Sequence, residues 1–416
     1  MSYNTQIIKL EDSGERVTII VDSGGMPVDL PSRYLLQKRD NRSAKTLSNL
    51  ATNICQLYRW SEDNGHDIEA RIKSGEVLGI TEIDSLIRYL RLNRRQASLI
   101  ENSKNNVVPM GAYVSGAMLT QKIDAVKGYL EWLGRVALEG RLITDPYCQV
   151  IAPAIKDLND QLDIRKTPSK SAPRYGLTMG EQRFLLEVTA PGHEKNPFQK
   201  RVQVRNHLMI KTLLMCGVRL GELLALQIPN CHLTGDNPYL YFTHNLTKDL
   251  DPRTMPPDVK TLSRRIYITK ELAAEFDSYI MNERKFRGRR KIGKLAPYVF
   301  LNTQKEPQPL SEPGFYQVCV TLREKFPEEL KALHPHRLRH TFNDNLVEMF
   351  SGDMKDEEFK KIQRWMNGWS DTSEEGKTYT RRSTEMKGMW ALVKMQNTLM
   401  GGTCADAEWL DEDIDF

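Results

Sequence analysis

The sequence predicts a mainly α-helical fold with one small β-hairpin, divided into two domains that follow an N-terminal extended arm. In most long segments, apolar residues recur at three- and four-residue steps, which is the period of an amphipathic helix. Stretches rich in β-branched and aromatic residues are few and short. Residues 165–175 contain two prolines and almost no apolar side chains, as is typical of a linker. The chain of 416 residues, 40% of them hydrophobic, is long enough for two cores.

Residues 1–42 are predicted to form the arm. Residues 16–21 are rich in β-branched side chains, and a Gly-Gly pair after them indicates a turn. Two prolines interrupt the chain that follows. The arm is too short to bury a core of its own, so we expect it to pack on another part of the protein.

Residues 43–164 are predicted to form a small all-helical domain. Ser43 is a suitable N-cap for its first helix, which carries a stripe of apolar residues. A second helix is expected to begin at Thr81, with Asp84 in the capping-box position, and a third at Thr120. Several amphipathic helices of this length can bury a common core only by packing together.

Residues 176–400 are predicted to form a second, α+β domain. Thr178 and Glu181 make a capping box at the start of its first helix. Residues 239–242 and 265–268 are β-rich and predict a hairpin whose strands are separated by a long polar excursion. Helices are expected near residues 178–190, 202–216, 219–227, 270–284, 312–326, 337–350, 355–366 and 384–399.

The formal net charge of +5 is unevenly distributed. The C-terminal tail, residues 401–416, contains six carboxylates and no Lys or Arg after Thr403, so the rest of the chain is clearly basic. This distribution suits a protein that binds phosphate groups, although a solvated acidic tail on any soluble protein explains it equally well.

The six cysteines include no CxxC pair and are expected to be free thiols in a reducing compartment. The first residues do not resemble a signal peptide, and no apolar run approaches the length of a membrane span. We therefore expect a cytoplasmic, nucleoid-associated protein that does not bind membranes.

Four segments of the second domain contain residues that phosphoryl-transfer chemistry requires. In the first, residues 216–226, Arg219 and Glu222 lie three positions apart and hence on one helical face, where the carboxylate could orient the guanidinium. A structural ion pair accounts for this spacing as well as a catalytic one does.

The second segment, residues 334–342, contains three histidines and two arginines within seven positions, a composition that core packing does not favour. His336, Arg339 and His340 share one face of the predicted helix. The i, i+4 spacing of the two histidines also suits zinc, but no carboxylate lies between them and the arginines would repel the cation. Cys231-His232 has no second pair of ligands at zinc spacing. No metal is expected.

The third segment is Gly368-Trp369, which follows an apolar helix. The fourth, residues 377–382, places Tyr379 in a short polar and basic stretch after an acidic loop. Alone, either segment is a weak signal.

The order G-x-R-x-x-E, H-x-x-R-H, G-[HW] and a tyrosine about ten residues later resembles the tyrosine recombinase (phage integrase) family, over roughly residues 175–400. The preceding helical domain and linker resemble the core-binding half of that family. The resemblance implies a two-domain, C-shaped clamp around double-stranded DNA. It also implies a homo-oligomer, dimer to tetramer, that carries out integration or excision of a mobile element, with other recombinases or directionality factors as possible partners.

The resemblance also implies roles for individual residues. Arg219 and Arg339 would clamp the scissile phosphate, since guanidinium groups bind phosphate through two hydrogen bonds and stay charged. His336 would act as general acid or base. Trp369 stands where the family more often has His, and can donate a hydrogen bond but not shuttle a proton. Tyr379 would attack the phosphate and form a 3′-phosphotyrosine.

A lysine of the hairpin would protonate the leaving 5′-oxygen, as the resemblance further implies. Lys260 is the preferred candidate, since residues 251–257 are interpreted as an insertion before the turn, and Lys248 is the alternative. Glu222 and His340 match supporting positions. This chemistry requires no metal and no nucleotide, so no cofactor is expected.

Two basic segments are expected to contact DNA phosphates, although an ordinary hinge and a solvated loop are the alternative interpretations. The candidates are Arg165, Lys166, Lys170 and Arg174 in the linker, and Arg287, Arg289, Arg290 and Lys291 in the densest cationic run.

The acidic tail carries Trp409, Leu410, Ile414 and Phe416, more large apolar residues than a disordered tail needs. We hypothesise that it packs on a neighbouring protomer or covers the basic site. Truncation after Gly402 tests both versions, because unchanged assembly and unchanged DNA affinity would contradict them.

Two other functions are compatible with these motifs. A type IB topoisomerase shares the chemistry without pairing two DNA sites. A non-catalytic DNA-binding subunit could retain the fold, although the presence of Arg219, His336, Arg339 and Tyr379 argues against it.

Overall fold

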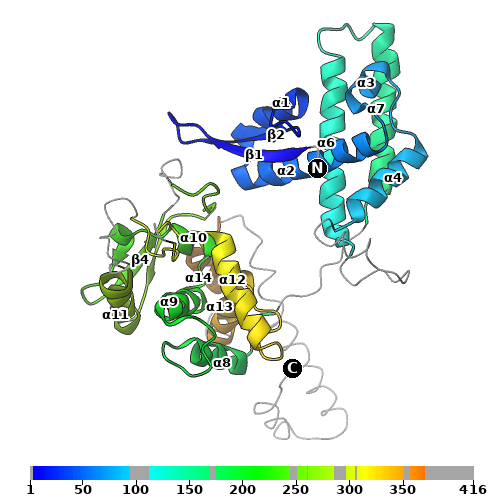
Figure 1. Ribbon diagram of the computed structural model, residues 1–416. Coiled ribbons are helices and arrows are strands. Elements are labelled where there is room, and N and C mark those ends of the chain that lie inside the picture. Colours follow the sequence, from blue (N-terminus) through cyan, green and yellow to red (C-terminus); the bar gives the residue numbers. More distant parts are fainter. Residues whose placement is uncertain are drawn as a thin grey trace, which may run out of the picture. The chain divides into compact units, whose positions relative to one another are not determined.

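The computed structural model describes residues 3–93, 112–167, 175–243, 251–259, 261–284, 297–304, 307–350 and 356–370 (Figure 1). The chain divides into an N-terminal unit, residues 1–171, and a C-terminal unit, residues 172–416. Each unit has its own large hydrophobic cluster. The described residues are mainly helical with one two-stranded and one three-stranded sheet, which confirms the predicted mainly α fold with small β elements.

The N-terminal unit begins with an antiparallel hairpin of β1 (Asn4–Lys9) and β2 (Arg16–Val21). Every residue of β2 is buried, because α1 (Asp29–Lys38) and α2 (Ala44–Asp63) pack against it. A 3₁₀ turn, Arg39–Asn41, joins the two helices. The predicted arm therefore packs on the helices that follow it.

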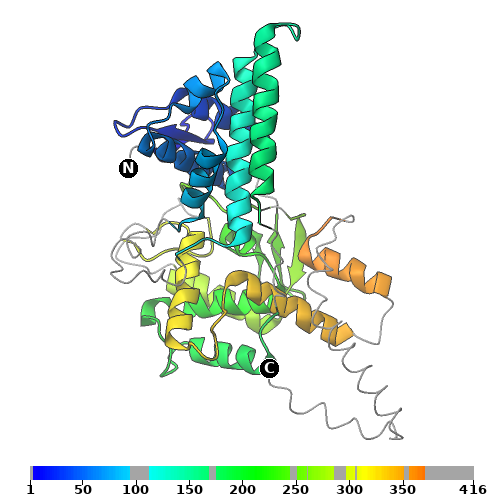
Figure 2. The same ribbon diagram turned by 90° about the vertical axis from the view of Figure 1, so that its right-hand side faces the viewer.

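The remaining helices of this unit are α3 (Ile68–Ser74), α4 (Ile80–Arg91), α6 (Gly116–Ala137) and α7 (Pro146–Ile164). The long helices α6 and α7 lie side by side, as two views of the molecule show (Figure 1; Figure 2). Their facing residues join those of α2 in the core of the unit.

One of the three predicted helix starts in this unit is confirmed. The hydroxyl of Ser43 caps α2 by accepting the backbone N–H of Thr46. The other two starts were wrong. Helix α4 follows Gly79, whose N–H donates to the Glu82 carboxylate (2.8 Å), and α6 follows Ser115. Apolar periodicity marks the buried face of a helix, whereas its first turn is often exposed and escapes that signal.

The C-terminal unit is built around α9 (Lys200–Cys216), which contacts α8, α10 and α13. Its three-stranded antiparallel sheet has the order β3–β4–β5, with Phe242 opposite Arg264 and Tyr241 opposite Arg265. The other elements are α8 (Met179–Thr189), α10 (Leu220–Ala225), a 3₁₀ turn (Ile228–Asn230), β3 (Cys231–His232), β4 (Tyr239–Phe242), β5 (Arg264–Tyr267), α11 (Lys270–Ser278), a π-helical turn (Tyr279–Arg284), α12 (Glu312–Lys325), α13 (Pro335–Phe350) and α14 (Asp356–Asn367).

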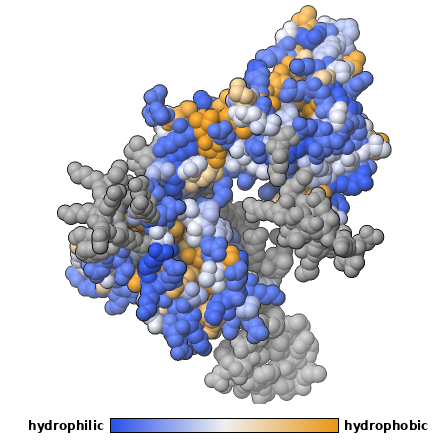
Figure 3. Space-filling view, viewed as in Figure 1, coloured by the Kyte–Doolittle hydropathy of each residue, from blue (hydrophilic) through white to orange (hydrophobic). Residues whose placement is uncertain are grey.

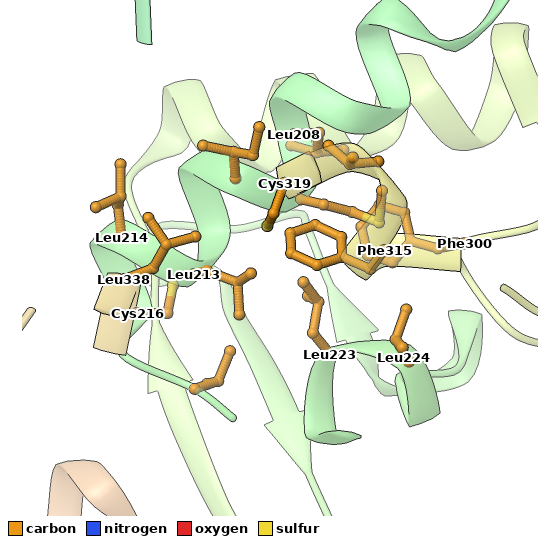
Figure 4. Packing of buried hydrophobic residues seen from close by; sticks show 14 of the residues in the cluster. Leu208, Leu213, Leu214, Cys216, Leu223, Leu224, Phe300, Phe315, Cys319 and Leu338 are labelled. Carbon is orange, nitrogen blue, oxygen red and sulfur yellow. The ribbon is translucent and has the colours of Figure 1, made fainter. Parts of the chain in front are cut away.

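Part of the core of this unit lies between α9, α10 and α12 (Figure 4). Apolar side chains from all three helices meet there, and burial of such side chains is the main source of stability in a domain of this size. The residues labelled in the close view are Leu208, Leu213, Leu214, Cys216, Leu223, Leu224, Phe300, Phe315, Cys319 and Leu338.

Hydrophilic side chains dominate the described surface in the view of Figure 3, with scattered hydrophobic patches. Within the described ranges, no helix is both long and apolar enough to cross a membrane.

Candidate active site

The segment that carries Arg219 is a sharp turn between two helices. Helix α9 ends at Cys216 and is capped by Gly217, which has a φ of +60°, and Arg219 is the N-cap residue of α10. The backbone N–H of Arg219 donates to the carboxylate of Glu222 (N to Oε2, 2.6 Å), which satisfies one of the N–H groups that the start of a helix leaves open. The turn thus fixes the backbone from which the half-buried Arg219 side chain extends.

Arg339 of α13 is almost completely buried, with 1% of its surface exposed. Its Nη1 donates to the carbonyl oxygen of Gly217 (2.5 Å), and its Nη2 donates to that of Asn367 (3.0 Å). Its Cζ lies 5.7 Å from the centre of the buried Trp369 ring. A single guanidinium therefore joins three of the predicted motif segments, since Gly217 precedes Arg219 by two residues and Asn367 precedes Trp369 by two.

The two histidines of the second segment differ in exposure. His336 is exposed, whereas His340 is buried with 1% of its surface accessible. Their rings meet edge to face, with centroids 4.6 Å apart. The exposed imidazole can meet a ligand, and the buried one packs behind it.

Helix α13 is held by the first residues of the C-terminal unit. The N–H groups of Gly176 and Leu177 donate to the side chains of Asp344 (2.9 Å) and Thr341 (2.8 Å). A Cβ on Gly176 would lie 2.6 Å from the Cα of Thr341, so only glycine fits there. This docking fixes the helix that carries His336, Arg339 and His340.

Glu222 forms a buried ion pair with Arg264, the first residue of β5. Nη1 of Arg264 lies 2.5 Å from Oε1 of Glu222, and Nη2 lies 3.2 Å from Oε2. The hydroxyl of Thr261 donates to the same carboxylate. Burial by itself would raise the pKa of Glu222, but the hydrogen bonds and charge of Arg264 outweigh burial and hold that pKa below its usual value.

A comparison with protein families finds that residues 193–386 match the phage integrase family. The match includes all four motif segments and Tyr379. These residues, somewhat less than half of the chain, are therefore similar to members of the phage integrase family.

One curated relative is tyrosine recombinase XerD of Halalkalibacterium halodurans, to which this chain is 27% identical over 180 residues, or 43% of its length. The chain spans half the length of that relative.

A search of solved structures gives matches of low sequence identity. Lambda integrase bound to DNA matches with a TM-score of 0.46 and 13% identity, covering 85% of this chain and 95% of that one. XerA recombinase matches with a TM-score of 0.35 and 16% identity, covering 88% and 96%.

Side-chain amides form a second buried connection in the integrase domain. The amides of Asn343 on α13 and Asn367 at the end of α14 bond to each other at 2.8 and 3.1 Å. Gln363 donates to Asn343 (3.2 Å), and Asn343 donates to the backbone carbonyl of Arg339 (2.9 Å). All three amide residues are at most 2% exposed. The network holds the end of α14 beside Arg339.

Arg264 and the residues of this amide network were not predicted from the sequence as site residues. The signal for Arg264 was the alternation of β5, in which positions 264 and 266 face inward and positions 265 and 267 face outward. The apolar Ile266 marks the inward face, so Arg264 shares it. The amide network had no local signal, because its residues come from two separate helices.

Several predicted site residues lie outside the described residues: Tyr379, both candidate lysines Lys260 and Lys248, Lys170, Arg174, Arg287, Arg289, Arg290, Lys291 and the tail 401–416. The residues on either side of Lys260 are described. Val259 and Thr261 are both buried, and Thr261 contacts Glu222.

The two described cations of the linker form ion pairs within the N-terminal unit. Nε of Arg165 lies 2.6 Å from the Asp84 carboxylate. Nζ of Lys166 lies 2.6 Å from the carboxylates of both Asp124 and Asp163. A DNA phosphate would have to compete with these carboxylates.

In the part of the chain that the structure describes, no three His, Cys, Asp or Glu side chains gather as metal ligands. The five cysteines described there are free thiols, and Cys404 lies outside the described residues.

Proposed function

We propose that this protein is a site-specific tyrosine recombinase that cleaves and rejoins double-stranded DNA through a covalent bond to Tyr379. The observation that carries this proposal is the convergence at Arg339. Its guanidinium bonds to the carbonyls of Gly217 and Asn367 and lies against Trp369, so segments far apart in the chain meet at one cationic group. The similarity of part of the chain to a tyrosine recombinase supports the same reaction.

The proposed reaction is a transesterification. The phenolic oxygen of Tyr379 attacks the scissile phosphorus, and the bond from phosphorus to the 5′-oxygen breaks. A tyrosine phenol has a pKa of about 10 and must lose its proton on attack. The exposed imidazole of His336 would accept that proton. The leaving 5′-oxygen takes a proton from Lys260. The products are a 3′-phosphotyrosine and a 5′-hydroxyl, and attack by a 5′-hydroxyl in the reverse sense rejoins the strand.

Arg219 and Arg339 would supply the charge that this reaction needs. Negative charge builds on the non-bridging oxygens as the pentacoordinate phosphorus forms, and preorganised cations stabilise that state most in a water-poor site. Arg339 is already held by two carbonyls, so little reorganisation would be required of it. The buried ring of Trp369 packs beside it and would keep its orientation.

The preference for Lys260 over Lys248 as the general acid gains support from its neighbours. Thr261 bonds to Glu222, which in turn holds the backbone of Arg219. Residue 260 is therefore one peptide away from a residue that contacts the arginine turn.

The proposal is tested by covalent trapping. Nicked duplexes that cover the DNA flanking the gene are incubated with the protein, and nicking next to the cleavage site lets the 5′-hydroxyl fragment diffuse away so that the adduct accumulates. We expect a denaturation-resistant adduct on one duplex, with mass spectrometry placing the nucleotide on Tyr379. Tyr379→Phe should keep DNA binding and lose the adduct.

Assays with the same protein and duplexes also distinguish the recombinase from the two alternative functions. A type IB topoisomerase would relax supercoiled plasmids without a particular site and would not join two sites in trans. A DNA-binding subunit would bind the duplexes but never form the adduct, and that result would contradict the proposal. For the recombinase, sequencing of joined strands from two cleaved sites would reveal whether it integrates or excises a mobile element.

A further inference from the structure

Arg264 is a buried arginine at a junction of three elements in the C-terminal unit. Arg264 is 4% exposed, and its guanidinium donates to both oxygens of the Glu222 carboxylate. Its Nε donates to the backbone carbonyl of Met366, at 2.8 Å, in the last turn of α14. One side chain thus ties the start of β5 to α10 and to α14.

The end of α14 is closely fitted around this side chain. Gly368 has a φ of +66°, and a Cβ there would lie 2.5 Å from Nη1 of Arg264 and 2.9 Å from Cβ of Thr261. The carbonyl of Gly368 accepts the backbone N–H of Leu262 at 3.1 Å. The glycine before Trp369 is therefore required because Arg264 occupies the space of its side chain.

We propose that Arg264 is a positioning residue for the phosphate-binding groups of the active site. Through Glu222 it fixes the backbone N–H of Arg219, and through Met366 and Gly368 it fixes the segment that carries Trp369. Trp369 in turn lies against Arg339. This inference rests on the proposed recombinase function and assigns a role that none of the four motifs contains.

The bidentate geometry makes lysine an informative replacement. A lysine at position 264 retains the positive charge beside Glu222 but donates all its hydrogen bonds from a single nitrogen. It therefore cannot hold both carboxylate oxygens and the Met366 carbonyl in one planar array. Arg264→Lys thus changes geometry more than charge.

Arg253 provides a matched control in the same unit. It is also buried, binds both oxygens of Asp251 and donates to the backbone carbonyls of Leu224 (3.1 Å) and Leu310 (2.8 Å). The two arginines therefore make bonds of the same kinds, but Asp251, Leu224 and Leu310 do not hold the Arg219 N–H or the Trp369 segment. Arg253→Lys should cost comparable stability without a selective effect on phosphate binding.

The experiment compares cleavage of two substrates by the intact protein. The trapping duplex carries either an ordinary phosphate or a methylphosphonate at the cleavage site mapped for the wild-type protein. A methylphosphonate has no negative charge on its non-bridging oxygen, so its cleavage depends less on well-placed arginines. The rate of adduct formation is measured for the wild type, Arg264→Lys and Arg253→Lys.

We expect Arg264→Lys to slow cleavage of the phosphate substrate by roughly 100-fold, the effect of displacing reacting groups by about 1 Å. Cleavage of the methylphosphonate should fall less than about 10-fold. Arg253→Lys should slow both substrates by the same factor, because lost folded protein affects them equally. An equal loss on both substrates for Arg264→Lys would overturn the inference.

Two further outcomes remain informative. If Arg264→Lys does not fold, Glu222→Gln breaks the ion pair from the other side, and the inference then requires its loss to be selective for the phosphate substrate. If the wild-type protein forms no adduct on any of the flanking duplexes, no cleavage site can be mapped, the proposed function is wrong and the inference falls with it. Adduct formation by the wild type without selectivity in either variant contradicts the positioning role alone.

Discussion

The ring of Phe342 lies in the space that a side chain on Gly217 would occupy. A Cβ at position 217 would come within 2.0 Å of Cδ1 of Phe342, and the φ of +60° there already favours glycine. Helix α9 can therefore end this close to α13 only at a glycine. The bond from Arg339 to the Gly217 carbonyl depends on this close approach.

Gly217→Ala is expected to destabilise the protein by about 2–5 kcal/mol, the sum of left-handed backbone strain and overpacking against a buried ring. Gly235→Ala is the control, because Gly235 has a φ of +91° and no atom within 4 Å of its ideal Cβ. It should cost only the backbone strain, about 1–2 kcal/mol. Urea unfolding of both variants measures the difference, and equal losses would mean that the Phe342 contact has no energetic weight.

Glu222→Gln should make the stability of the protein less sensitive to acid. The pKa of Glu222 is held below its usual value near 4.5 in the folded protein, so the carboxylate contributes stability above that pH and loses it as the pH falls through the folded pKa. The variant should be less stable than the wild type at pH 7, and this difference in stability should stay constant down to about pH 4.5 and narrow below it. Thermal unfolding from pH 7 to well below pH 4.5 checks it, and parallel curves over the whole range would contradict the prediction.

The described cysteines should differ sharply in their reactivity. Burial raises the pKa of Cys216, Cys231 and Cys319 to about 12 and that of Cys55 to about 11, so their thiolate fractions at pH 8 are small. Cys148 and Cys231 are half-buried, whereas Cys55, Cys216 and Cys319 are buried. Iodoacetamide at pH 8 should modify Cys148 before the three buried thiols, as followed by peptide mass spectrometry. Denaturant should remove the difference, and rapid labelling of Cys216 in the native protein would contradict the burial of that thiol.

The two basic segments should contribute unequally to DNA binding. Arg165 and Lys166 are engaged by carboxylates, so their replacement by Gln should change the salt dependence of binding only slightly. Replacement of Arg287, Arg289 or Arg290 by Gln should make the plot of log K against log salt less steep. The magnitude of its slope should fall by about 1 for each of these arginines that contacts a phosphate. Fluorescence anisotropy with a labelled duplex at several salt concentrations distinguishes the two segments. A larger change in the salt dependence of binding for Arg165→Gln than for Arg289→Gln would contradict this prediction.

Local patterns in the sequence were sufficient for the helices with a clear apolar stripe and for the hairpin strands β4 and β5. They were insufficient where proline coincides with a helix. Helices α1 and α7 contain Pro31 and Pro146 in their first turns. Backbone N–H groups in the first turn have no acceptor within the helix, so a proline there is compatible with a helix start.

The candidate site was predictable only in part, because long-range contacts decide how its residues are held. Arg219 and Glu222 were identified from their spacing, but the ion-pair partner of Glu222 is Arg264, 42 residues away. Alternation with Ile266 indicates that Arg264 faces inward, but it does not indicate which carboxylate the Arg264 side chain meets.

The connection between Asn343, Gln363 and Asn367 consists entirely of groups that neither gain nor lose a proton in water. The angle between α13 and α14 should therefore stay constant over the pH range in which imidazoles titrate and at salt concentrations that screen contacts with phosphate. The junction beside the buried Arg339 should therefore keep its geometry through the changes in pH and salt that would release a nucleic acid from the proposed site.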